Sequence, residues 1–326
     1  MLLRLLPDLE RWSIPVVCTV LRDLRDLSIL ADRRLADGVE EGMDRVEEAA
    51  RIIHKAFTIC LTHKAPSSSV TLQWGVHALA ALLFSVYVIL GKESNCKSIL
   101  RALKAAGKDL PSLPSLPMSH QVAFRYYVGI VAFREGDGLR AEEELGFSLI
   151  HCHKLAKGNM QRILLYLVPL RLLRGKAPAR ALLTKYPGIQ QTYGDILSAV
   201  RDGAVGEFDR LLRQRISTLA RVGTYLVVEK ARFIALRQLF RKVWIYSGKS
   251  SRIPMSQFQT ALRVAGLPSP SLEETECILA NLIYREYMKG YLSHEWEMVV
   301  LKKGEPFPPL SQVSVMGMSA VSSGTV

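Results

Sequence analysis

Long segments rich in Leu, Ala, Arg and Glu make up most of this chain, and Gly, Pro or Ser interrupts them about every 15 to 25 residues. Segments of this length and composition are typical of helices, and the interrupting residues are typical of the turns between them. With 326 residues, of which 49% are hydrophobic and 22% charged, the chain has ample material for a folded core. The pattern therefore predicts an all-α architecture of consecutive helical hairpins.

One stretch, residues 124–151, shows the hairpin pattern most clearly. Gly129 lies in its first half, and Gly136 and Gly138 flank an aspartate where the chain would reverse. A looser version of the same order follows at residues 196–208. Such pairs resemble tetratricopeptide-type hairpins, which stack into a superhelix because no single pair buries its own apolar face. We therefore expect a superhelical array of irregular hairpins.

The pattern changes after about residue 250. Residues 253–263 predict a short amphipathic helix, and Ser271 with Glu274 forms a capping box that predicts the start of the next helix. Residues 291–301 have a turn signal near their middle and β-branched residues at their end, which fits a two-stranded hairpin. Three helices followed by a β-wing is the order of a winged-helix domain.

These patterns divide the chain into four segments. We assign residues 1–117 to N-terminal helical hairpins, residues 118–224 to a continuing helical array, residues 225–310 to a C-terminal winged-helix subdomain with a small β-wing, and residues 311–326 to a disordered tail. The tail contains small and polar residues without any charge, a composition that does not form a core.

The longest apolar stretch, residues 76–90, is too short to span a bilayer and carries His77 and Ser85. It predicts a buried core helix. The first residues, Met1 to Asp8, form a short apolar run that contains an arginine and ends at a proline, unlike a secretory signal. We therefore expect no membrane association.

Catalytic motifs are absent from the sequence: it has no Gly-rich phosphate loop, no G-x-S-x-G and no H-E-x-x-H. His151 and His153 would lie about 200° apart around a helix, so they cannot share a metal ion in helical geometry. The five cysteines are widely spaced without a C-x-x-C pair, which predicts reduced and mostly buried thiols. We expect a protein that is not an enzyme and has no cofactor or metal.

Positive charge is concentrated in the second half of the chain. The net charge is +13, and residues 151–225 contain 13 Lys or Arg against four Asp or Glu. Such a surplus attracts nucleic acid, an anionic membrane surface or an acidic protein, and composition alone leaves a generically solvated basic face equally open. The candidate nucleic-acid contacts in the winged-helix segment are Arg237, Arg241, Lys242, Lys249, Arg252, Arg263, Arg285, Lys289, Lys302 and Lys303.

Three runs near the C-terminus resemble a known family. They are Glu276-Cys-Ile-Leu-Ala-Asn-Leu-Ile-Tyr284, Met288-Lys-Gly-Tyr-Leu-Ser-His294 and Glu305-Pro-Phe-Pro-Pro-Leu310. Together with the helical hairpins they resemble the PCI family, the scaffold subunits shared by the proteasome lid, the signalosome and translation-initiation factor three. The resemblance extends over about residues 12–310 and points to the branch that serves in the nuclear transcription-and-mRNA-export complex. Members usually carry further helices before the point where Ile14 aligns, so we expect the first hairpins to be missing here.

This resemblance implies a non-catalytic scaffold at nuclear pores, with some protein in the cytoplasm. Its winged helix would pair with that of a large Sac-type or germinal-centre-associated nuclear protein, and a small acidic subunit shared with the proteasome lid would stabilise the pair. The composite platform would bind RNA or DNA with weak sequence preference. The alternative is a protein-only scaffold of a signalosome-like or lid-like assembly.

The resemblance also implies roles for individual residues. Lys289, Lys302 and Lys303 are the best phosphate contacts, and Arg285 lies one helical turn before Lys289. Trp296 could either stack on a base or pack within the wing. The expected partner-binding residues are Tyr284, Tyr287, Tyr291, His294 and Trp296.

Overall fold

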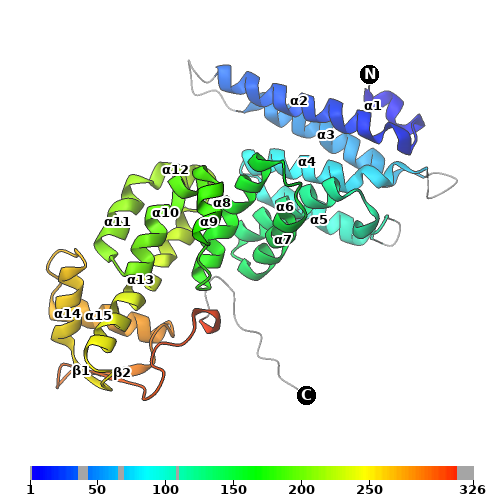
Figure 1. Ribbon diagram of the computed structural model, residues 1–326. Coiled ribbons are helices and arrows are strands. Elements are labelled where there is room, and N and C mark those ends of the chain that lie inside the picture. Colours follow the sequence, from blue (N-terminus) through cyan, green and yellow to red (C-terminus); the bar gives the residue numbers. More distant parts are fainter. Residues whose placement is uncertain (1, 36–42, 65–69, 108–109, 314–326) are drawn as a thin grey trace, which may run out of the picture. The chain divides into compact units, whose positions relative to one another are not determined.

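The computed structural model describes residues 2–35, 43–64, 70–107 and 110–313, which form helices and one three-stranded sheet (Figure 1). The chain divides into two compact units. The first contains residues 1–135 and 143–153, and the second contains residues 136–142 and everything from residue 154 onward. The predicted fold class, helical hairpins followed by a winged helix, is confirmed. The four-segment division made from the sequence stays a prediction, and most of the expected disordered tail lies outside the described residues.

The first unit is a series of helices that pack on one another in chain order. α3 packs between α2 and α4, and α4 packs in turn against α6. The elements are α1 (Leu2–Leu5), η1 (Leu6–Asp8), η2 (Arg11–Ser13), α2 (Ile14–Leu35), α3 (Asp44–Thr62), η3 (Leu72–Gly75), α4 (Val76–Ile89), α5 (Glu93–Ala105), η4 (Leu113–Ser115), α6 (Met118–Glu135) and α7 (Gly138–His151), the last of which is shared with the second unit.

The predicted core helix is α4. The stretch Leu72–Ile89 is long and apolar enough to cross a membrane by length and composition, but 72% of it is buried inside the protein. Leu79, Leu83 and Phe84 are almost completely buried among residues of the neighbouring helices. The prediction of a buried core helix is therefore confirmed, whereas the expectation that the run is too short to span a bilayer is wrong, because η3 lengthens it to 18 residues.

The predicted hairpin of residues 124–151 is formed by α6 and α7. A Cβ atom placed on Gly129 would lie 2.7 Å from Cγ of Leu145, so only glycine permits this approach of the two helices. Gly136 adopts a φ of +83° at the turn between them. Both glycines act as the sequence predicted.

Buried His77 and half-buried His120 are expected to make the first unit sensitive to acid. Nδ1 of His77 and Nδ1 of His120 are buried without a hydrogen-bond partner among the described residues, and the His77 ring lies 5.0 Å from that of Phe124. Burial lowers the pKa of both histidines; His120 lowers that of His77 further, and Arg22 lowers that of His120. Both imidazoles are therefore neutral in the folded state at pH 7.

We expect the free energy of unfolding to be independent of these two histidines only above about pH 7.5, and to fall by about 1 kcal/mol as the pH drops through 6.5 toward 5. The free energy of unfolding falls because the unfolded chain binds protons at the ordinary histidine pKa, whereas the folded protein binds them only at lower pH. Urea denaturation between pH 7.5 and 5 measures this, with a His77→Gln/His120→Gln variant as comparison. A wild-type protein with the same pH dependence as the variant would contradict the prediction.

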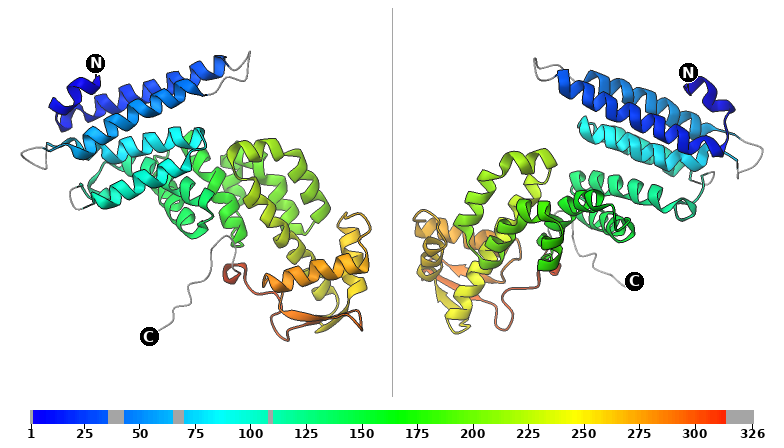
Figure 2. Two further views of the ribbon diagram at one scale, coloured as in Figure 1. Left: turned by 180° about the vertical axis from the view of Figure 1, so that it is seen from behind. Right: turned by 45° about the horizontal axis from the view of Figure 1, so that its top comes forward.

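The second unit combines helices of 6 to 22 residues with the sheet of the winged helix. Its elements are α8 (Lys157–Leu173), α9 (Arg180–Lys185), α10 (Pro187–Asp202), α11 (Val205–Gln214), α12 (Ile216–Val222), α13 (Tyr225–Tyr246), β1 (Arg252–Pro254), α14 (Met255–Val264), α15 (Leu272–Tyr284), β2 (Gly290–Ser293), β3 (Met298–Leu301) and η5 (Leu310–Gln312). The strands are antiparallel in the order β1-β3-β2. Figure 2 shows the helices and the sheet from two further sides.

Most of the predicted winged-helix elements are present, with one correction. The capping box at the start of α15 is formed in both directions between Ser271 and Glu274. The helix expected to start at residue 253 instead starts at Met255, because Ile253 and Pro254 belong to β1. Ile253 is 1% exposed and pairs with Val299 of β3, so burial against the sheet decides its conformation.

The strand register separates two faces of the sheet. Ile253 and Val299 point inward and are buried. The neighbouring row of Arg252, Val300 and Tyr291 lies on the opposite face, where Arg252 and Tyr291 are exposed. This alternation follows from the two-residue period of a β-strand.

A close backbone contact joins the helical part of the second unit to its winged helix. Gly206 lies at the start of α11, and Ala265 follows the last residue of α14. The N–H of Gly206 donates to the carbonyl of Ala265 at 2.9 Å. A Cβ atom on Gly206 would lie 2.5 Å from the carbonyl oxygen of Gly266. Since that neighbour is backbone, the two segments would have to move apart to accommodate a side chain.

We expect Gly206→Ala to lower the free energy of unfolding by about 2 kcal/mol because of this overpacking. The matched control is Gly158→Ala in α8, where a Cβ atom would meet nothing within 4 Å. That change should raise the free energy of unfolding by about 0.5 kcal/mol through the entropy of the unfolded chain. Equal effects of the two substitutions in chemical denaturation would show that the contact is not tight.

Candidate nucleic-acid and partner interface of the winged helix

Three lysines meet at the base of the wing. The register pairs Gly290 with Leu301, and the N–H of Lys302 donates to the carbonyl of Lys289 at 2.9 Å, so the ladder continues one step beyond the strands. The N–H of Lys289 also donates to the carbonyl of Pro306 at 2.7 Å. Lys289, Lys302 and Lys303 are exposed, and none of them forms an ion pair with a described residue. The structure therefore brings together the three residues expected to contact phosphate, although such contact stays a prediction.

Arg237 does not fit the role assigned from the sequence. It lies in α13, is 6% exposed, and its Nη2 donates to the carbonyls of Phe307 (3.2 Å) and Pro308 (2.7 Å). Burial lowers the pKa of Arg237, and the nearby Arg241 lowers it further. Its guanidinium is occupied inside the protein, so we remove Arg237 from the candidate surface.

The other predicted cations are exposed but spread over the winged helix. The guanidinium of Arg285, at the end of α15, lies 4.5 Å from the ring centroid of Phe233. Nζ of Lys242 donates to the carbonyl of Asp202 at 2.8 Å. The remaining four are Arg241 on α13, Lys249 in the turn after it, Arg252 on β1 and Arg263 in the last turn of α14.

Negative charge covers the first turns of α15 and the tip of the wing. Glu273 and Glu274 are exposed in the first turn, and Glu276 lies 2.9 Å from Nδ1 of His294. The hydrogen bond and charge of Glu276 raise the pKa of His294. Glu295 and Glu297 add two further carboxylates in the wing turn. These carboxylates make the first turns of α15 and the wing tip unfavourable positions for phosphate.

The predicted partner-binding residues fall into two groups. Tyr284, Tyr291 and Trp296 are 86%, 62% and 76% exposed, and the side chain of His294 is also exposed. Trp296 therefore does not pack within the wing. Tyr287 is 3% exposed and stacks on Phe233 with the ring centroids 6.0 Å apart, so its role is internal packing and not partner contact.

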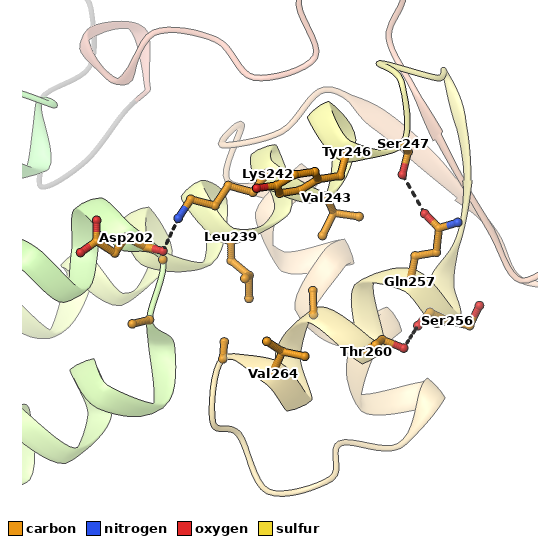
Figure 3. Close-up of a pocket in the computed structure, with 14 residues that line it drawn as sticks. Asp202, Leu239, Lys242, Val243, Tyr246, Ser247, Ser256, Gln257, Thr260 and Val264 are labelled. Carbon is orange, nitrogen blue, oxygen red and sulfur yellow. Dashed lines mark hydrogen bonds between the residues drawn. The ribbon is translucent and has the colours of Figure 1, made fainter.

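A groove between α13 and α14 was not predicted from the sequence. It has a volume of about 730 Å³. Figure 3 shows Leu239, Val243 and Val264 directed toward it. Val264 and Tyr246, which both line the groove, are 83% and 88% exposed. The sequence did not predict the groove because its walls come from α13, α14 and the turn at residues 202–204, which only the tertiary structure brings together.

Metal and thiol chemistry have little support at these surfaces. Across the described ranges, no group of three or more His, Cys, Asp or Glu side chains is placed to hold a metal ion. Cys60, Cys96 and Cys152 are buried as predicted, whereas Cys277 on α15 is exposed. Burial raises the pKa of the Cys60 and Cys96 thiols to about 12, so these two are unreactive.

Helical hairpins joined to a winged helix define a scaffold-type protein, and comparison with known proteins agrees. The PCI domain family matches residues 210–303, which span α11 to the end of the wing. The chain is 39% identical over 307 residues to "Protein CSN12 homolog" of Schizosaccharomyces pombe, covering 90% of this chain and 71% of that relative. It is 33% identical over 307 residues to "PCI domain-containing protein 2" of Danio rerio (94% and 75% covered) and 35% identical over 311 residues to the Drosophila melanogaster homolog (95% and 76% covered).

The chain belongs to the PCI family. Proteins with this domain are generally non-catalytic scaffold subunits, and the names of the relatives give no enzymatic activity. The resemblance inferred from the three C-terminal sequence runs is therefore confirmed at the level of the family and of these relatives.

Proposed function

We propose that this protein is a non-catalytic scaffold subunit of a nuclear mRNA-export or transcription-coupled complex, which pairs its winged helix with a partner subunit and binds nucleic acid. The observation that carries the proposal is the meeting of Lys289, Lys302 and Lys303 at the base of the wing, exposed and without acidic partners among the described residues. Lysines gathered on one stretch of backbone attract phosphates, which release their counterions on binding.

The proposed mode of binding is contact with the backbone of RNA or DNA. The acidic start of α15 and the acidic wing tip keep phosphates away from the helix that would read bases. Contacts limited to phosphates fix position but carry no sequence information. Binding is therefore weakly sequence-specific and strongly dependent on salt.

The proposed protein contacts are the exposed aromatic residues and the groove. Tyr284, Tyr291 and Trp296 supply large, rigid contact area of the kind enriched at interfaces. The expected partners are a large subunit with its own winged helix and a small acidic subunit, to which the net charge of +13 is complementary. The expected location is the nucleus, at nuclear pores, with a fraction in the cytoplasm.

Purification of the tagged full chain from nuclear extract at moderate salt, with and without nuclease, tests this function. Co-purification of a large winged-helix subunit and a small acidic subunit in both samples, with RNA or DNA only in the untreated one, is the expected result. Recovery of neither subunit would refute the proposal.

A second candidate, a protein-only scaffold in a signalosome-like or proteasome-lid-like assembly, is favoured by the negative charge of α15 and the wing tip. Under this hypothesis the basic surface binds an acidic protein, and the chain does not bind nucleic acid. Its apolar subunit interface would survive high salt, whereas the nucleic-acid contact would not. Recovery of signalosome or lid subunits without nucleic acid would support this candidate over the first.

A further inference from the structure

A separate hollow of about 610 Å³ lies in the first unit, between α3 and the start of α5, far along the chain from the basic residues considered above. Its composition is unusual because three of its ten lining residues are cations and only one is a carboxylate. The lining residues are Glu47, Ala50, Arg51, His54, Lys55, Tyr87, Leu90, Lys92, Asn95 and Ser98.

The positive charge in this hollow is only partly compensated. Nζ of Lys92 pairs with Oε1 of Glu47 at 2.6 Å. The hydrogen bond and charge of Lys92 lower the pKa of Glu47, and the charge of Arg51 lowers it further. Arg51 and Lys55 are four residues apart on α3, where like charges destabilise a helix. An anion between them would relieve that repulsion.

Neutral donors line the same hollow. Tyr87 is 8% exposed, and burial raises the pKa of its phenol, so the hydroxyl keeps its proton. This hydroxyl lies 3.5 Å from Nδ1 of His54. Asn95 contributes an amide and Ser98 a hydroxyl from α5. The 13-residue helix α5 also begins here, with Lys92 as its N-cap, and a helix N-terminus carries partial positive charge.

We propose that this hollow binds a small molecule with clustered phosphates. Its cations come from two helices and would contact different phosphates of one ligand, while its volume exceeds the needs of a single phosphate. Guanidinium and ammonium groups recognise phosphate through charge-assisted hydrogen bonds, and Tyr87, Asn95 and Ser98 add neutral donors to the same hollow. This site does not depend on the lysines at the base of the wing.

Isothermal titration of the full chain with sodium tripolyphosphate tests the proposal. We expect binding by the wild-type protein that weakens with added salt, and at least a tenfold weaker affinity for Arg51→Gln/Lys55→Gln. The control Arg101→Gln, an exposed position on α5 outside the hollow, should bind like the wild type. Tripolyphosphate should also raise the melting temperature of the wild type but not of the Arg51/Lys55 variant, which separates lost binding from misfolding.

Further titrations identify the source of the phosphates. ATP without magnesium and vesicles containing phosphatidylinositol bisphosphate are compared with tripolyphosphate. Tighter binding of either one, lost in the Arg51/Lys55 variant, supports the site and names a nucleotide or a lipid headgroup as its ligand. Absence of tripolyphosphate binding, or equal binding by the variant, overturns the proposal.

Discussion

Replacing Arg237 with alanine is expected to lower the free energy of unfolding by about 3 kcal/mol. The guanidinium donates to the carbonyls of Phe307 and Pro308, two buried residues of the segment that follows the wing. Each carbonyl left without a donor in the interior costs about 1–3 kcal/mol. The aromatic ring of Phe307 packs near both Arg237 and Trp244, so the loss would also loosen this packing.

Arg241→Ala is the matched control, because Arg241 lies one helical turn further along α13 and is exposed. We expect a change within about 0.5 kcal/mol for it. Chemical denaturation of both variants measures the difference, and limited proteolysis reports whether cleavage after residue 303 becomes faster in the Arg237 variant alone. Similar stability of the two variants would mean that the C-terminal segment is held by other contacts.

The second large effect is expected for reversal of charge at the base of the wing. Lys289→Glu/Lys302→Glu/Lys303→Glu should weaken binding to single-stranded RNA by about a hundredfold at low salt. Since each neutralised phosphate contributes about 0.7 to the slope of log affinity against log salt, the slope should fall by about 2. Fluorescence anisotropy with a labelled oligouridine between 50 and 200 mM salt measures both quantities. The affinity for RNA falls because three charges that attract phosphate are replaced by three that repel it.

A triple variant at exposed cations elsewhere provides the control. Arg101→Glu/Lys104→Glu/Arg180→Glu makes the same change in net charge, and all three positions lie outside the winged helix. If binding depends only on total charge, the two triple variants will lose affinity equally, and the base of the wing is then not the contact. If the wing variant keeps its affinity for RNA, the base of the wing is likewise not the contact.

Several features of the fold could be predicted from the sequence because they depend on neighbouring residues. The capping box of Ser271 and Glu274 uses atoms within four residues of each other. Gly129 and Gly136 marked the α6–α7 hairpin because one allows close approach and the other a positive φ. The continuous apolar run of α4 was enough to predict that this helix is buried.

The candidate site could be predicted only in part. Lys289, Lys302 and Lys303 were expected to be exposed and near the wing, and the strand register places them together. Composition could not separate Arg237 from Arg241, because both are arginines on one helix at a spacing of four residues. Tyr287 and Tyr291 are likewise similar in sequence, yet one is buried on Phe233 and the other faces outward from the sheet.

The sequence by itself determined the class of fold, the positions of the turns and the excess of positive charge, because these follow from local propensity, hydrophobic period and composition. Only the tertiary structure decided which charges are available. Arg237 is buried because residues 307 and 308, seventy positions later, supply the carbonyls that satisfy it. In the same way, the groove between α13 and α14 and the hollow beside α5 depend on how separate helices pack, which residue spacing along the chain does not specify.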